Sequence, residues 1–166
     1  MKIFEELNAR IESKNLERED SGAPKIRPVE IQVLGQVSLL ANELATKVLA
    51  LQRTNDLDAL LKNTEYFVKA TLANEILPKY NLVFDNDSEK IWLPPGHSFD
   101  ILCELSCTRV KLLDPESALV SKAVKAPGKN KILIAEAIAS EKFPNLLERI
   151  QENGGDLSLF LEDESD

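Results

Sequence analysis

The chain has 166 residues, of which 43% are hydrophobic and 29% are charged. This length and composition predict one soluble globular domain with a single sizeable core, and they argue against global disorder. No apolar run approaches the roughly 20 residues that a membrane helix needs, and the acidic N-terminus lacks the features of a signal peptide, so we expect a cytoplasmic protein. The net charge of −8 disfavours broad binding to nucleic acid, because phosphate backbones attract basic proteins.

The first half of the chain alternates helical and strand patterns. Apolar residues recur at helical spacing near the N-terminus, whereas apolar and polar residues alternate over 29–35. Leu-rich and Ala-rich helical spacing follows, and QRTN ends it. In chain order we predict a surface helix over 1–20, a strand over 29–34, a helix over 37–51, a strand over 56–61 and a helix from Thr64 to Pro78.

The second half begins with short strands and ends with helices. Asp114 followed by Pro115 is typical of a helix start. In order we predict strands over 82–84, 90–93, 99–105 and 108–113, helices over 114–125, 131–142 and 143–154, and an acidic tail over 156–166. These elements predict an α/β (α+β) fold with a mixed sheet of roughly four to six strands. Residues 29–34 and 56–61 should be neighbours in a sheet and helix unit spanning 29–112, with the helices of 114–153 gathered at one end.

The stretch from Gly35 to Asp58 carries the most chemical information. Residues two apart on a strand point to the same side, so Asp56 and Asp58 should project together. Two converging carboxylates suit Mg²⁺, which commonly takes one or two protein carboxylates plus substrate phosphates. A glycine turn followed by Ser38 at a helix start offers donors to a phosphate. Each piece alone is common, because most Asp-x-Asp pairs are solvated turn residues or helix caps, and the order of the pieces makes the pattern informative.

This order resembles a known family. The residues that carry the resemblance are Gly35, Ser38, Arg53, Thr54, Asp56 and Asp58, together with the segment VKLLDPESALVSKAVKAPGKNK. They are similar to the signature of the nucleotidyltransferase superfamily, nearest to its small prokaryotic branch related to abortive-infection and toxin–antitoxin proteins. The resemblance covers about residues 29–138.

The resemblance implies a nucleotidyltransferase fold and Mg²⁺-dependent transfer of a nucleoside monophosphate from a nucleoside triphosphate to a hydroxyl group. Asp56 and Asp58 would hold the metal, and Asp100 is the expected third carboxylate, as a ligand or a base. Gly35 and Ser38 would seat the phosphates, and Arg53 and Lys122 would neutralise them. The ordinary alternatives are a strand-edge acid for Asp100, a surface lysine for Lys122, and for Arg53 an ion pair with the neighbouring Asp56.

Departures from the family pattern keep other functions open. Gln36 stands where the family has a second glycine, Asn130 replaces an aspartate, and Leu133 replaces an acid. The first alternative is a degenerate relative that binds a protein partner or a nucleotide without transferring anything. The second is a coincidental resemblance in an unrelated α/β interaction module. We expect the convergence of the three aspartates beside Gly35 and Ser38 to separate these possibilities.

Overall fold

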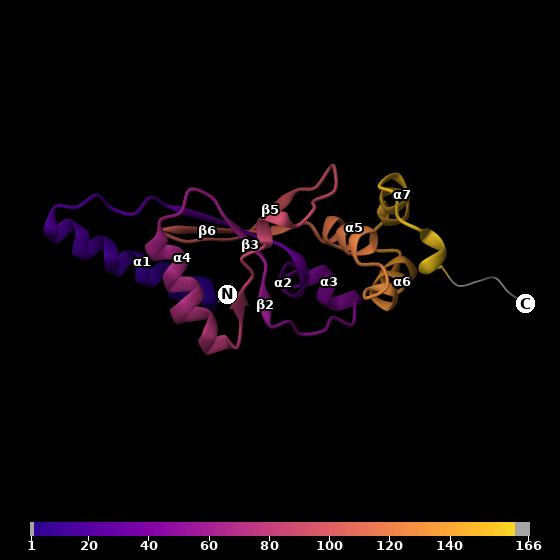
Figure 1. Cartoon of the computed structure of the whole chain (residues 1–166), viewed down its shortest axis with the longest axis horizontal. Coiled ribbons are helices and arrows are strands. Elements are labelled where there is room, and N and C mark those ends of the chain that lie inside the picture. The colour runs from indigo at the N-terminus through magenta and orange to yellow at the C-terminus, as the bar shows by residue number, and fades with distance from the viewer. Residues whose placement is uncertain (1, 162–166) are drawn as a thin grey trace, which may run out of the picture.

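The computed structural model describes residues 2–161 and is an α/β protein with its two ends built from helices (Figure 1). The strands are β1 (Val29–Val33), β2 (Asp56–Leu57), β3 (Ala59–Leu61), β4 (Val83–Phe84), β5 (Phe99–Glu104) and β6 (Thr108–Leu113). The α-helices are α1 (Lys2–Ser21), α2 (Gly35–Leu40), α3 (Glu43–Val48), α4 (Tyr66–Ala70), α5 (Pro115–Lys125), α6 (Lys131–Ser140) and α7 (Leu146–Glu152). Within these described residues, no helix is both long enough and apolar enough to cross a membrane.

The main sheet has four strands in the order β3-β1-β6-β5. Strand β1 is antiparallel to β3 and parallel to β6, and β5 is antiparallel to β6, so the predicted mixed sheet is confirmed. The predicted strand over 56–61 is divided, because only β3 pairs with β1. Its first part, β2, pairs with β4 in a separate small parallel sheet. Asp58 stands at the break between β2 and β3.

Three local predictions differ from the structure. The single helix predicted over 37–51 is two short helices, because the Asn42 side chain caps α3 by accepting a 2.9 Å hydrogen bond from the amide of Ala45. Helix α4 begins two residues after Thr64, whose hydroxyl donates to the carbonyl of Lys62 instead of capping the helix. It continues through a π-helical turn and a 3₁₀ turn to Tyr80. The strand predicted over 90–93 is absent; a 3₁₀ turn, Ser88–Lys90, and irregular chain occupy that region.

Two clusters of buried apolar side chains hold the fold together. The first lies between α1, the α4 region and one face of the sheet, and it includes Leu7, Ile31 and Leu57. The second lies among α2, α3 and the C-terminal helices, and it includes Leu119 and Ile134. Figure 1 shows α1 and α4 towards one end of the molecule and α5, α6 and α7 towards the other, with α2 and α3 between them.

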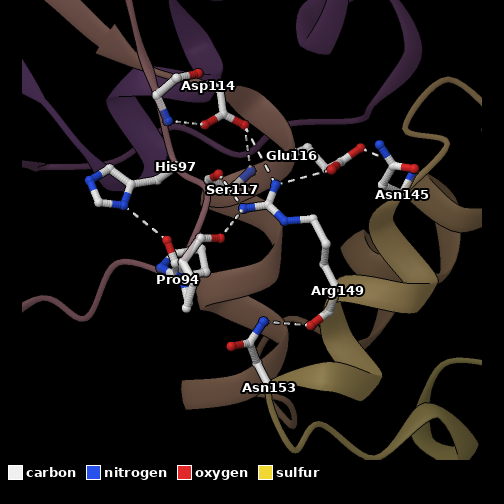
Figure 2. A network of polar contacts seen from close by, with 10 residues as sticks. Pro94, His97, Asp114, Glu116, Ser117, Asn145, Arg149 and Asn153 are labelled. Carbon is white, nitrogen blue, oxygen red and sulfur yellow. Dashed lines mark hydrogen bonds and ion pairs between the residues drawn. The ribbon is translucent and has the colours of Figure 1, made fainter.

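Arg149 fixes α7 against the start of α5 (Figure 2). Its guanidinium is only 15% exposed and donates to the Glu116 carboxylate at 3.0 Å and to the Ser117 hydroxyl at 2.8 Å. It also donates to the carbonyl of Pro95 at 3.2 Å. Asp114 caps α5, as predicted, by accepting from the amide of Ser117 at 2.8 Å. The N-terminal end of α5 is therefore held by charge-assisted hydrogen bonds, which are stronger than neutral ones.

The predicted acidic tail is described only in part. Residues Leu157–Leu159 form a 3₁₀ turn and Phe160 is buried in the second cluster, so this part of the tail packs against the fold. Residues 162–166 lie outside the described part of the chain.

Candidate functional site

Asp58 and Asp85 come together at the ends of two short parallel strands. The register of β2 and β4 places Asp56 beside Val83 and Leu57 beside Phe84, so the next step brings Asp58 beside Asp85. The amide of Asp85 donates to the carbonyl of Leu57 at 2.9 Å. Backbone pairing therefore holds two carboxyl groups next to each other, and Asp56 lies two residues before Asp58, at the start of β2.

Gly35 leaves the space that the Asp58 carboxyl group occupies. A Cβ atom on Gly35 would lie 2.5 Å from Oδ2 of Asp58, and the backbone of Gly35 has a φ of +57°. Both features favour glycine, since a side chain would collide with the carboxylate and would strain a left-handed backbone. The glycine of the sequence motif thus has a structural reason here: it lets the chain after β1 pass directly beside Asp58.

Asp58 is electrostatically unsatisfied. Its Oδ1 atom is buried and has no hydrogen-bond partner among residues 2–161. Burial raises the pKa of Asp58 from 3.8 to about 7, and the hydrogen bond with Asp85 and the charges of Asp85 and Asp56 act in the same direction. The pKa of Asp85 is lowered, first by the hydrogen bond that it shares with Asp58. Burial and the neighbouring carboxylates therefore favour the protonated form of Asp58, whereas the ionised form is favoured at Asp85.

A cavity of about 540 Å³, which we call the cationic cavity, has Lys122 in its lining, and the charge of Lys122 acts on Asp58. One wall is the segment 50–54 between α3 and β2, and the other is formed by α5, the turn after it and the start of α6. Arg53, Lys122 and Lys129 line this cavity, and none of them makes an ion pair within residues 2–161. Burial lowers the pKa of Lys122, Lys129 lowers it further, and the charge of Asp58 opposes them.

Two side chains hold the segment 50–54 in place across this cavity. Gln36 donates from Nε2 to the carbonyl of Gln52 at 2.8 Å, and Glu136 of α6 accepts from the amide of Ala50 at 2.8 Å. Both side chains also line the cavity. Gln36 therefore ties α2 to the segment 50–54.

The structure brings together part of the predicted site. Gly35, Asp56, Asp58 and Lys122 form one neighbourhood, because the charges of Asp56 and Lys122 both influence Asp58. Arg53 lines the adjoining cavity and is not paired with Asp56. Five of the residues selected from the sequence, Arg53 among them, therefore lie in this region.

Ser38 lies beside Gly35 but is buried, and Asp100 lies apart from the site. Ser38 is fully buried and its hydroxyl donates to the carbonyl of Gly35 at 2.6 Å, so it stabilises the first turn of α2 and presents no exposed group to a phosphate. Asp100 is exposed on the edge strand β5. Across the sheet, Ala59 pairs with Val33, Val33 with Leu112, and Leu112 with Asp100. Asp100 and Ala59, the residue after Asp58, are therefore three strand spacings apart, or about 14 Å. The expected convergence of Asp100 with Asp56 and Asp58 is therefore not observed, because β1 and β6 stand between them.

Asp85 and Lys129 are the residues of this neighbourhood that sequence reasoning did not select. Asp85 belongs to the segment DNDSE, which has the composition of a polar turn. The sequence feature that could have identified Asp85 is its position directly after the short apolar run 82–84, just as Asp58 follows Leu57. Lys129 lay in a local basic cluster with Lys122, and its place in the cavity follows from the turn between α5 and α6.

The carboxylates fit a divalent cation only with help from a ligand. Among residues 2–161, no group of three or more His, Cys, Asp or Glu side chains is arranged to hold a metal ion. Mg²⁺, however, commonly binds one or two carboxylates and completes its shell with phosphates and water. Asp58, with its unpartnered Oδ1, and Asp56, whose charge acts on Asp58, are the carboxylates that would hold such an ion.

Comparison of the chain with protein families, with characterised proteins and with solved structures gives no match.

Proposed function

We propose that this chain binds a nucleoside triphosphate together with a divalent cation beside Asp58, and that it transfers the nucleoside monophosphate to a hydroxyl acceptor. The proposal is carried by the buried Oδ1 of Asp58, which has no hydrogen-bond partner within residues 2–161, together with Lys122, whose charge acts on Asp58. Lys122 lines a cavity with Arg53 and Lys129, and these three cations make no ion pair within the same residues. An orphaned acidic oxygen favours a cation, and a cationic cavity favours an anion. A metal-bound polyphosphate satisfies both requirements at once.

The basic and acidic side chains would have different roles. Arg53, Lys122 and Lys129 would bind the phosphates and offset the negative charge that grows on the leaving group. Asp56 and Asp58 would hold Mg²⁺, which supplies charge neutralisation at the phosphates when it is bound. The acceptor oxygen attacks the α-phosphorus, the bond from that phosphorus to the β-phosphate oxygen breaks, pyrophosphate leaves, and the hydroxyl proton passes to water.

Binding without transfer is the second candidate. Gln36 donates to the Gln52 carbonyl at the lining of the cavity, and the Ser38 hydroxyl donates to the carbonyl of Gly35 within the first turn of α2. Both features reduce the donors available to a triphosphate at the start of α2. A protein of this kind would bind a nucleotide, or a protein partner, and leave the phosphates intact.

Calorimetry with each of the four nucleoside triphosphates and Mg²⁺ tests the binding step. We expect binding that requires the metal, that is at least tenfold weaker in Asp58→Asn and in Lys122→Met, and that is unchanged in the matched control Asp100→Asn. Mg²⁺ or Mn²⁺ should also raise the melting temperature of the wild type, since a ligand that binds only the native state stabilises it. No binding of any triphosphate, or equal binding by Asp58→Asn, would refute the proposal.

Transfer is tested separately from binding. α-Labelled nucleoside triphosphate added to the protein and a cell extract should give a labelled product that requires Asp58. Binding without any labelled product would favour the second candidate. Gln36→Gly, which removes the bridge to Gln52, should then strengthen triphosphate binding.

A further inference from the structure

The segment 50–54 depends on contacts from other elements for its position. It lies between α3 and β2, has no regular secondary structure, and forms one wall of the cationic cavity. The amide of Ala50, its first residue, donates to the Glu136 carboxylate of α6 at 2.8 Å. A hydrogen bond to a charged acceptor is stronger than one between neutral groups. Glu136 therefore ties the beginning of the segment to α6.

Arg53 lies between two further backbone contacts. Before it, the carbonyl of Gln52 accepts from Gln36 at 2.8 Å. After it, the carbonyl of Asn55 accepts from the amide of Val83 at 2.7 Å. The backbone is thus held on both sides of Arg53, whose side chain lines the cavity. The path of the segment therefore sets the point from which this side chain extends.

The negative charge of Glu136 has no partner in the cavity. Glu136 is an acidic side chain in a lining that also holds Arg53, Lys122 and Lys129. It makes no ion pair with these cations or with any other among residues 2–161. A carboxylate in this place repels a polyphosphate, so its charge does not help such a ligand to bind. Its contact with the Ala50 amide needs an acceptor oxygen and does not require the charge.

We propose that Glu136 is a positioning residue of the cationic cavity: its oxygen fixes the segment 50–54 through Ala50, and the fixed segment holds Arg53 in place for the phosphates of the ligand. The contact between Arg53 and phosphates rests on the proposed function, whereas the fixing of the segment does not. Glutamine at position 136 keeps an acceptor oxygen and removes the charge, and alanine removes both. The two substitutions therefore separate the effect of the oxygen from that of the charge.

Calorimetry on the full chain, with inorganic triphosphate and Mg²⁺ as the probe, tests the effect on binding. We expect Glu136→Gln to bind the probe at least as tightly as the wild type and Glu136→Ala to bind it at least tenfold more weakly. The loss in Glu136→Ala could not come from the missing charge, because removing a negative charge favours an anion. The matched control is Glu148→Ala, an exposed position outside the cavity lining, which should bind as the wild type does.

A double-mutant cycle tests whether Glu136 acts through Arg53. Arg53→Met should weaken binding, and in that background Glu136→Ala should cause less than a further threefold loss. Losses that multiply in full would overturn the link to Arg53. Equal weakening by Glu136→Gln and Glu136→Ala would show that the charge is needed and would also overturn the proposal, as would undiminished binding by Glu136→Ala.

Amide hydrogen exchange tests the position of the segment without any ligand. The Ala50 amide should exchange at least tenfold faster in Glu136→Ala than in the wild type and return to the wild-type rate in Glu136→Gln, while β1 stays unchanged. Unchanged exchange at Ala50 would overturn the proposal. Triphosphate binding that requires Asp58 but is the same in Glu136→Ala would overturn this inference and leave the proposed function intact. If the wild type binds no triphosphate, the proposed function fails and the exchange of Ala50 decides whether Glu136 fixes the segment.

Discussion

Replacing Asp58 by asparagine should stabilise the protein in a way that depends on pH. Folding raises the pKa of Asp58 from 3.8 to about 7, with burial as the largest cause. At pH values between these two pKa values, the folded state therefore keeps a proton on Asp58 that the unfolded state has released. The resulting penalty is absent below pH 3.8, grows as the pH rises and is complete above pH 7.

The size of the penalty follows from the pKa shift. At 1.36 kcal/mol per pH unit, the shift corresponds to about 4 kcal/mol. Because the carboxyl group is only half-buried, solvent screening reduces this to about 2 kcal/mol. An asparagine side chain carries no charge, and its amide can still donate to Asp85. The free energy of unfolding of Asp58→Asn minus that of the wild type should therefore be about 2 kcal/mol larger at pH 8.5 than near pH 4.

Urea denaturation of both proteins at the two pH values measures this difference. At pH 8.5 the gain corresponds to a rise in melting temperature of roughly 4–8 °C for a chain of this size. Saturating Mg²⁺ should narrow the gap at pH 8.5 by stabilising only the wild type, since the cation offsets the buried charge. An equal effect of the substitution at both pH values, or a loss of stability at pH 8.5, would refute the reasoning.

Three further substitutions test other parts of the structure. Gly35→Ala should lower the free energy of unfolding by about 1–3 kcal/mol, because Gly35 has a positive φ and a Cβ atom there would lie 2.5 Å from Asp58. In a double-mutant cycle, this loss should be smaller in an Asp58→Ala background. Arg149→Met should cost about 2–4 kcal/mol in urea denaturation because it leaves the half-buried Glu116 without its partner; an unchanged midpoint would contradict the anchoring role of Arg149. Asp100→Asn should change stability by no more than about 0.5 kcal/mol and leave the thermal response to Mg²⁺ intact, as expected for an exposed side chain on an edge strand.

Features that depend on neighbouring residues were predictable from the sequence. Asp114 and Pro115 start α5 as predicted, because a cap needs only a side chain and an amide three residues later. The pairing of residues 29–34 with part of 56–61 was also predicted, since alternating apolar residues specify which face of a strand is buried. The break at Asn42 was within reach, because asparagine before Glu43 is a typical helix start.

Features that leave no pattern in the local sequence were not predictable. Asp85 reaches Asp58 through a parallel ladder of two-residue strands, which leaves almost no periodic signal in the sequence. Asp100 was placed near the other aspartates by resemblance, but its distance from them is set by the order of four strands. Strand order is a global property, so neither residue could be assigned from its local neighbours.

The two clusters of buried side chains have a consequence for cooperativity. Asp58 follows Leu57 of the first cluster, whereas Lys122 lies on α5 between Leu119 and Ala123 of the second. A ligand that contacts both side chains therefore links two regions that could otherwise open independently. The hydrogen-exchange rates of β1 and α5 should differ in the free protein and become similar when the ligand is bound. Binding would then convert two independently unfolding regions into one cooperative unit.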